Sequence, residues 1–191
     1  MFSAPNFILF VMFTASLWCG FVWAYGELFN WTQWLSGINL IYFPHGLRMV
    51  LAILFGFAGA VGIMLGTALM GLALIKSNLL LGLAQSFVAG FAVWAATHLV
   101  LRPAGTPILN ASKAIRIESL DGKSLIVLAF ASAVLNASGH TLAWYLFDAE
   151  AEQLELRFAS MFTGDLLGAL VLLYALRSVV LFVERKGRNQ S

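Results

Sequence analysis

The chain has 191 residues, of which 61% are hydrophobic and only 10% are charged, and its mean hydropathy is +0.88. Soluble domains contain about 45–50% apolar and about 25% charged residues, so this composition excludes an ordinary soluble domain and predicts a polytopic membrane protein. The net charge of +2 comes from basic residues that flank apolar segments, a pattern that indicates membrane orientation and not nucleic-acid binding.

Apolar segments follow one another along the chain. The first, residues 7–25, has neither a basic start nor a small-residue cleavage site, so we expect an uncleaved span. Residues 79–101, 124–147 and 158–183 are each long enough to cross a bilayer. Between the first span and these lies a stretch of 42 residues, 34–75, which fits one span after an interfacial loop or two tightly joined spans.

Glycines in this ambiguous stretch favour two spans. Gly56, Gly59 and Gly62 indicate a turn or kink, and a single helix through the stretch would be overlong for a bilayer. We therefore predict an all-α transmembrane helical bundle of six spans, with five as the alternative, and one span broken at Pro44. Residues 1–191 would form a single integral membrane domain, which leaves no room for a separate catalytic domain.

Charged residues set the predicted orientation. The loop of residues 102–123 and the tail of residues 184–191 are basic, whereas the connection of residues 148–157 is mostly acidic. Because basic connections stay in the cytoplasm, a chain of six spans would have both termini there. Aromatic residues fall at the opposite ends of the spans and predict an outer interfacial belt of Trp23, Tyr25, Trp31, Trp34, Trp144 and Tyr145.

Polar side chains interrupt the outer half of several spans. Ser132, Asn136 and His140 are spaced four residues apart and share one helical face. A charge near the bilayer centre costs at least about 2.5–3.5 kcal/mol unless it is paired or hydrated, so such residues should converge inside the bundle. We predict a ligand-binding site formed by Asn39, His45, Arg48, Gln85, Asn136, His140 and Asp165.

Pro44 and Gly46 should open a helix in the middle of this polar set. Proline removes a backbone donor, so the carbonyls of residues 39–41 would be free at membrane depth and would have to face protein or a wet cavity. A half-helix that starts at this point, beside His45 and Arg48, would present positive potential to a small anion. Structural roles are the alternatives: Arg48 could neutralise Asp165 or reach an interface, and the histidines could join helices.

Small residues at four-residue spacing predict close contacts between helices. Gly62 and Gly66 form one such pair, and Ser160, Gly164 and Gly168 form a second series. A third series is Gly82, Ser86 and Gly90. Their usual role in membranes is close approach of two backbones, so we assign them no chemistry.

Two stretches carry a family resemblance. "FPHGLRMVLAILFGFAGAVGIMLGTALMG" has a proline and glycine that open a helix, then a glycine-marked turn and a second glycine-containing helix, and "FTGDLLGALVLLY" has a G-D-x-x-G pattern at Gly164, Asp165 and Gly168. Both resemble the MASE-type membrane-associated sensor domain, the first of that series. The resemblance covers about a quarter of the chain. The chain differs from the family in two respects: it has Phe43 where a tryptophan is usual, and six expected spans where about eight are usual.

This resemblance implies a shortened, stand-alone sensor module in a bacterial cytoplasmic (inner) membrane. Its partners would be the lipid bilayer, a small-molecule ligand and another membrane or cytoplasmic protein that receives the signal. We expect no nucleic-acid partner.

Two other functions compete with the sensor. A chain of this length with six helices also suits a small-molecule transporter, or the substrate-binding subunit of an energy-coupling-factor transporter, although such subunits carry A-x-x-x-A on the first helix and here Cys19 follows Ala15 at that spacing. An enzyme could use His45 and His140 for haem or metal. The motifs C-x-x-C-H, H-E-x-x-H and G-x-S-x-G are absent from the sequence, so we expect no enzyme and no cofactor.

Overall fold

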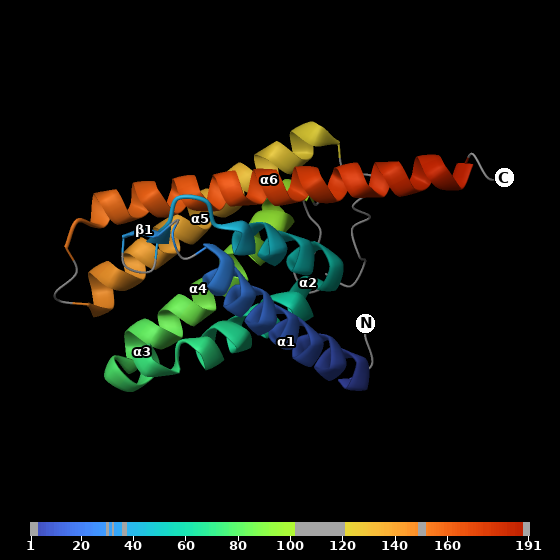
Figure 1. The fold of residues 1–191 in the computed structure, drawn as a ribbon. Helices are drawn as coiled ribbons and strands as arrows, with labels where there is room; N and C mark the ends of the chain where they lie inside the picture. The colour runs from blue at the N-terminus through green and yellow to red at the C-terminus, as the bar shows by residue number, and fades with distance from the viewer. Residues whose placement is uncertain are drawn as a thin grey trace.

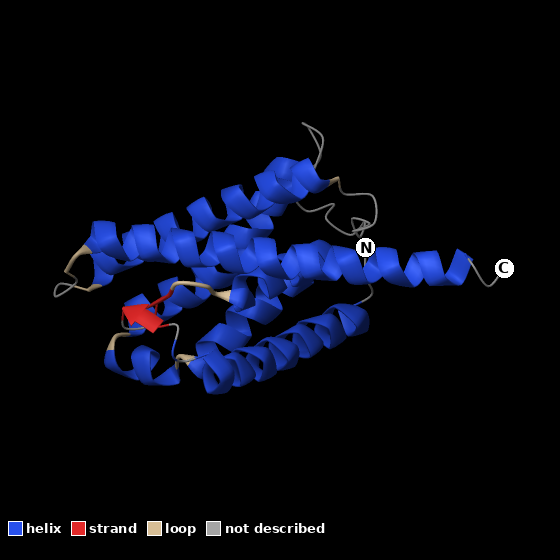
Figure 2. Ribbon diagram, turned by 45° about the horizontal axis from the view of Figure 1, so that its top comes forward, coloured by secondary structure: helices blue, strands red, loops and turns tan. Residues whose placement is uncertain are grey.

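The fold is an all-α bundle of long apolar helices with one short β-hairpin at one end (Figures 1 and 2). A computed structural model describes residues 4–29, 31, 33–35, 38–101, 121–148 and 152–188. Within these residues, five helices are long and apolar enough to cross a membrane, which confirms the predicted transmembrane bundle. The elements are α1 (Ala4–Phe29), β1 (Gln33–Leu35), β2 (Ile38–Asn39), α2 (Phe43–Met70), α3 (Leu72–Ser77), α4 (Leu79–Leu101), α5 (Gly122–Phe147) and α6 (Leu154–Arg188).

Helix α2 is bent back on itself at Gly56. This residue has φ 54° and ψ −126°, a conformation that essentially only glycine adopts. A Cβ atom on Gly59 would lie 3.1 Å from the carbonyl carbon of Leu51. In a straight helix, residues eight positions apart are separated by about 12 Å along the axis, so α2 is sharply bent at Gly56, and Figure 1 shows its second arm running back toward α3.

The bend at Gly56 gives the chain six passes along the bundle (Figure 1), although five of the helices in the described part of the chain are long enough to be spans. The start of α1 and the end of α6 therefore lie at the same end of the bundle (Figure 1). The predicted turn among the glycines is confirmed, but the break predicted at Pro44 is misplaced. Pro44 lies in the first turn of α2, where a missing backbone donor is tolerated, so it starts the helix and does not interrupt one.

Glycines bring the helix backbones into contact, as their spacing predicts. A Cβ on Gly62 would meet the side chain of Thr14 at 2.6 Å, and one on Gly66 would meet Trp18 at 2.7 Å, which places the second arm of α2 directly on α1. A Cβ on Gly168 would lie 2.7 Å from the backbone nitrogen of Phe43. This contact fixes the first turn of α2 against α6.

The β-hairpin and the residues that follow it pack into one end of the helix bundle. The backbone N–H of Tyr42 donates to the carbonyl of Gly164 over 2.9 Å, and the hydroxyl of Tyr25 donates to the carbonyl of Ile41 over 2.5 Å. Gly164 lies ten residues into α6, or about 15 Å from its start. Non-helical backbone is tolerated at such depth only when protein satisfies it, as these helices do here.

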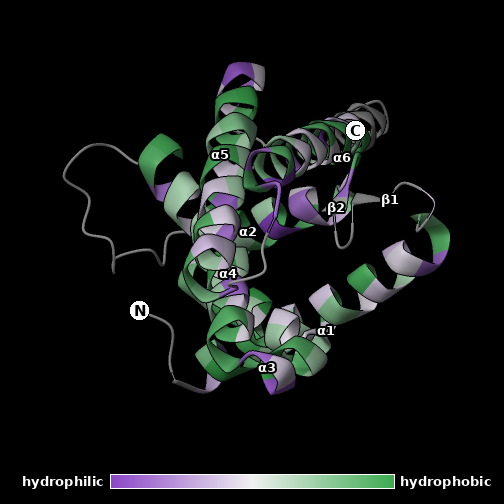
Figure 3. Ribbon diagram, turned by 90° about the vertical axis from the view of Figure 1, so that its left-hand side faces the viewer, coloured by the Kyte–Doolittle hydropathy of each residue, from purple (hydrophilic) through white to green (hydrophobic). Residues whose placement is uncertain are grey.

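Hydrophobic residues dominate the ribbon, and hydrophilic positions occur within α5 and around β2 (Figure 3). The aromatic residues expected in the interfacial belt differ in exposure, and the belt itself stays a prediction. Trp23, Trp31 and Tyr145 are 65%, 80% and 70% exposed, but Tyr25 is only 6% exposed, and its ring packs against those of Phe29, Tyr42 and Phe43. The side chain of Trp34, most of the loop of residues 102–123, and residues 189–191 of the tail lie outside the described residues.

Candidate functional site

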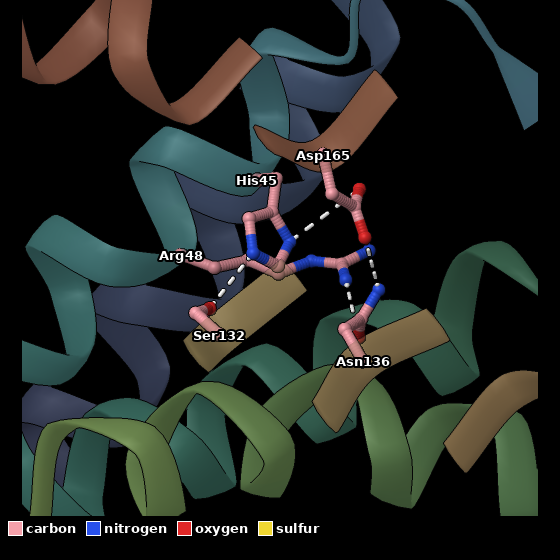
Figure 4. A network of polar contacts seen from close by, with 5 residues as sticks. All are labelled: His45, Arg48, Ser132, Asn136 and Asp165. Atoms are coloured by element: carbon pink, nitrogen blue, oxygen red, sulfur yellow. Dashed lines mark hydrogen bonds and ion pairs between the residues drawn. The ribbon is translucent and has the colours of Figure 1, made fainter. Parts of the chain in front are cut away.

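Helices α2, α5 and α6 each send polar side chains to one cluster inside the bundle (Figure 4). His45, on the first turn of α2, places its Nε2 atom 2.8 Å from the hydroxyl of Ser132 on α5. Its Nδ1 atom lies 3.5 Å from Oδ1 of Asp165 on α6, a distance that forms an ion pair when the ring is protonated. His45 thus holds three helices together from a fully buried position.

Asn136 links the two charged residues of the cluster. Its Oδ1 atom accepts a hydrogen bond from Nη1 of Arg48 over 3.1 Å, and its Nδ2 atom donates to Oδ2 of Asp165 over 2.7 Å (Figure 4). Arg48 is 5% exposed and Asp165 is 2% exposed. A neutral amide therefore connects a buried cation with a buried anion: Arg48 donates one charge-assisted hydrogen bond to it, and Asp165 accepts one from it.

Aromatic rings cover the guanidinium group of Arg48. The central carbon of that group lies 4.7 Å from the ring of Trp18 on α1 and 5.5 Å from the ring of Tyr42. A cation over an aromatic face is attracted by about 0.5–1 kcal/mol at exposed sites and by about 2 kcal/mol when it is desolvated. Together with Asn136, these rings stabilise the position of a charge that would otherwise be costly in the membrane interior.

The cluster borders a cavity of about 140 Å³. At roughly 30 Å³ for each water in the liquid, this volume corresponds to about five water molecules. The floor of the cavity is buried and carries both charges, whereas its rim is half-buried. The floor consists of Arg48, Gln85, Asn136, His140 and Asp165, and the rim of Asn39, Tyr42, Trp144 and Met161.

Two nitrogen atoms on residues of the floor have no hydrogen-bond partner among the described residues: Nε of Arg48 and Nδ1 of His140. Both are buried, and a buried polar atom without a partner costs roughly 1–3 kcal/mol. Gln85 is better satisfied, because its Nε2 atom donates to the carbonyl of His140 over 3.3 Å. The cavity thus offers a charged donor, an imidazole nitrogen and a carboxylate to a molecule bound inside it.

The structure brings together all seven residues that the sequence predicts for the site. Six line the cavity, and His45 lies behind it in contact with Ser132 and Asp165. The predicted alternative that Arg48 neutralises Asp165 takes an indirect form, since both residues form hydrogen bonds with the side-chain amide of Asn136. The prediction missed three lining residues: Tyr42, Trp144 and Met161.

Helical spacing could have found two of these missed residues. Trp144 follows His140 by four positions on α5, and Met161 precedes Asp165 by four positions on α6, so each shares a helical face with a predicted site residue. Tyr42 carries no such signal, because it lies in the non-helical segment just before α2.

Comparison of the chain with protein-family models, with curated proteins and with solved structures finds no match. The resemblance to the sensor-domain family therefore stays a prediction. Among the described residues, no group of three or more histidine, cysteine, aspartate or glutamate side chains could hold a metal ion. The site is thus best interpreted through its cavity, its two charges and the polar groups around them.

Proposed function

We propose that this chain is an integral membrane sensor module that binds a small polar ligand in the cavity and signals to a partner protein. One observation carries the proposal: polar side chains from α2, α4, α5 and α6, together with Asn39, line a single cavity with a buried floor and a half-buried rim. Ionisable residues at membrane depth are costly, and their usual explanation is a functional site. The ligand would present an acidic or other acceptor group to Arg48.

Helix α6 supplies a route for the signal. It carries Asp165 at the cavity and continues to Arg188, 23 residues further along, which corresponds to about 35 Å of helix. It extends past the other helices toward the C-terminus (Figure 1). We place this basic end in the bacterial cytoplasm and the cavity toward the outside, because basic segments stay inside. A ligand that moves Asp165 would then shift a rigid helix on the opposite side of the membrane.

A substrate-binding subunit of a transporter is the second candidate, because six passes in about 190 residues also suit such a subunit. The packing of α1 argues against the energy-coupling-factor form. Ala15 is 7% exposed, and Cys19 donates a weak hydrogen bond from its sulfur to the carbonyl of Gly66 over 3.5 Å. The face on which these subunits would dock their partner is thus occupied by α2 of the same chain.

The proposal is tested with the purified chain in lipid nanodiscs. A panel of small carboxylates, amino acids, amines and polyols is screened for compounds that raise the unfolding temperature of the wild-type chain. We expect at least one compound to bind, and we expect Gln85→Ala to weaken its binding by about tenfold, because Gln85 lines the cavity floor. Ser86→Ala is the matched control, since the Ser86 hydroxyl donates to the carbonyl of Gly82 in its own helix.

Proteoliposomes then separate the two candidate functions. A compound that binds to the cavity but is not accumulated supports the sensor, and accumulation that Gln85→Ala abolishes supports the transporter. Equal binding by the wild type and by Gln85→Ala would contradict both functions, because the ligand would then lie elsewhere.

A further inference from the structure

We infer that the ligand of this cavity is a small zwitterion, a molecule that carries one carboxylate and one ammonium group within about five or six non-hydrogen atoms. This inference rests on the proposed function, because it names the chemical class of the ligand that the cavity would bind. A free amino acid with no side chain or a very short one has this chemistry.

The two charges on the cavity floor balance each other. With neutral imidazoles, the floor contains one positive charge on Arg48 and one negative charge on Asp165. A simple anion would leave the buried site with a net negative charge, and a simple cation would leave it with a net positive one. Either excess is costly in a medium of low dielectric constant, whereas a zwitterion leaves the net charge at zero.

Both charged groups of the cavity floor can form further hydrogen bonds. Arg48 has five N–H donors, and its Nε has no partner among the described residues. Asp165 accepts one hydrogen bond from Asn136 over 2.7 Å and has Nδ1 of His45 3.5 Å from its other oxygen, while a carboxylate can accept about four hydrogen bonds. A ligand carboxylate would therefore bind to Arg48, and a ligand ammonium group would bind to Asp165.

His140 can bind either the carboxylate or the ammonium group of the ligand. Its Nδ1 atom has no partner among the described residues, and the ring lies on the cavity floor with Arg48 and Asp165. In the tautomer that carries the proton on Nδ1, it donates a hydrogen bond to a ligand carboxylate, and in the other tautomer it accepts one from an ammonium group. Either arrangement satisfies an atom that the protein leaves without a partner.

The volume of the cavity limits the size of the zwitterion. About 140 Å³ is the liquid volume of roughly five water molecules, so a ligand that fits inside the cavity must be small. Glycine has five non-hydrogen atoms and alanine has six, so both fit with little change in the lining. Leucine has nine and would have to displace the rim residues, of which Trp144 is the largest.

The test compares matched compounds in wild-type protein in nanodiscs, with binding measured by titration calorimetry. L-Alanine carries both groups, propionate lacks the ammonium group, and ethylamine lacks the carboxylate. We expect alanine to bind at least tenfold more tightly than propionate or ethylamine, and glycine to bind at least tenfold more tightly than leucine. Glycerol, which is neutral and of similar size, is the control for simple polar binding.

Asp165→Asn should remove the preference of the site for alanine over propionate. Without the negative charge, the site should bind propionate at least as well as alanine, while Ser86→Ala should keep the wild-type order. The wild-type measurements decide the question even if Asp165→Asn does not fold.

Several outcomes would overturn the inference. Propionate or glycerol that binds the wild type as tightly as alanine would show a ligand site without zwitterion selectivity, which leaves the proposed function standing. Absence of binding by alanine and glycine would also overturn the inference, and the broader screen with Gln85→Ala would then decide the proposed function separately.

Discussion

Asn136 on α5 donates a hydrogen bond to Asp165 on α6 over 2.7 Å, and this contact forms part of the cavity floor. The same amide accepts a hydrogen bond from Arg48 on α2 over 3.1 Å. One neutral side chain therefore joins three helices and two opposite charges. The stability of the bundle and the shape of the cavity should both depend on it.

Asn136→Ala should lower the free energy of unfolding by about 1–3 kcal/mol. It removes two hydrogen bonds to charged groups, each worth about 1.5–3 kcal/mol in soluble proteins, but interhelical bonds in membranes average only about 0.6 kcal/mol. Reversible unfolding in a mixed-micelle titration measures the change. Ser86→Ala is the control and should change stability by less than about 0.5 kcal/mol, because that hydroxyl bonds only to its own helix. Equal effects of the two substitutions would show that the Asn136 bridge contributes nothing.

Arg48 and Asp165 should show strong coupling in a double-mutant cycle. Removal of one member of a buried pair leaves the other charge uncompensated, at a cost of about 3–5 kcal/mol in soluble proteins, whereas removal of both can be nearly neutral. We expect Arg48→Met with Asp165→Asn to be less destabilising than the sum of the two single substitutions by at least about 1 kcal/mol.

The control cycle pairs Arg48→Met with Thr97→Ala. The hydroxyl of Thr97 bonds to the carbonyl of Val93 in its own helix, so these two effects should add within about 0.5 kcal/mol. Additive effects of Arg48→Met and Asp165→Asn would mean that the two charges do not compensate each other.

Gly56→Ala should destabilise the chain by about 1–3 kcal/mol, because alanine does not readily adopt φ 54° and ψ −126°. Thermal unfolding in detergent detects the change. Gly20→Ala is the matched control: Gly20 is helical, a Cβ there would have no neighbour within 4 Å, and alanine should be neutral or stabilising by up to about 1 kcal/mol. A neutral Gly56→Ala would mean that α2 does not turn back at this residue.

Gly164→Ala should separate the hairpin segment from α6. Its Cβ would overlap the carbonyl oxygen of Asn39 and lie 3.2 Å from the carbonyl carbon of that residue. Overpacking of this kind costs about 1–3 kcal/mol, and because Asn39 is part of the cavity rim, ligand binding should weaken as well. Gly122→Ala is the control, since a Cβ at that position meets nothing within 4 Å. Unchanged stability and binding in Gly164→Ala would contradict the close seating of Asn39.

The sequence predicts the helices and much of the site because both follow from the periodicity of single helices. Ser132, Asn136 and His140 share a face by their four-residue spacing, and that face does point to the cluster that holds His45 and Asp165. The turn at Gly56 was also predictable, since a cluster of glycines interrupts an overlong apolar segment.

The remaining features depend on contacts between distant segments. Pro44 starts α2 because a hairpin of only five β-residues precedes it, and strands this short have no periodic signal. Tyr25 is buried where residues 41–43 return to it: its hydroxyl donates to the carbonyl of Ile41, 16 positions away, and its ring packs against Tyr42 and Phe43. Asn136 bridges two charges only because α2 and α6 meet beside it. The spacing of residues within one helix does not predict such a contact among three helices.

The most direct test of the central claim, a hydrated cavity open to one side of the membrane, is cysteine labelling in cells. Met161→Cys places a thiol at the cavity rim, in a Cys19→Ser background that removes the natural thiol. A membrane-impermeant maleimide added from outside should label it at least tenfold faster than Leu51→Cys, a core position that is 1% exposed. Equal labelling of the two positions, or labelling of Met161→Cys only after the cytoplasmic side is opened, would contradict the claim.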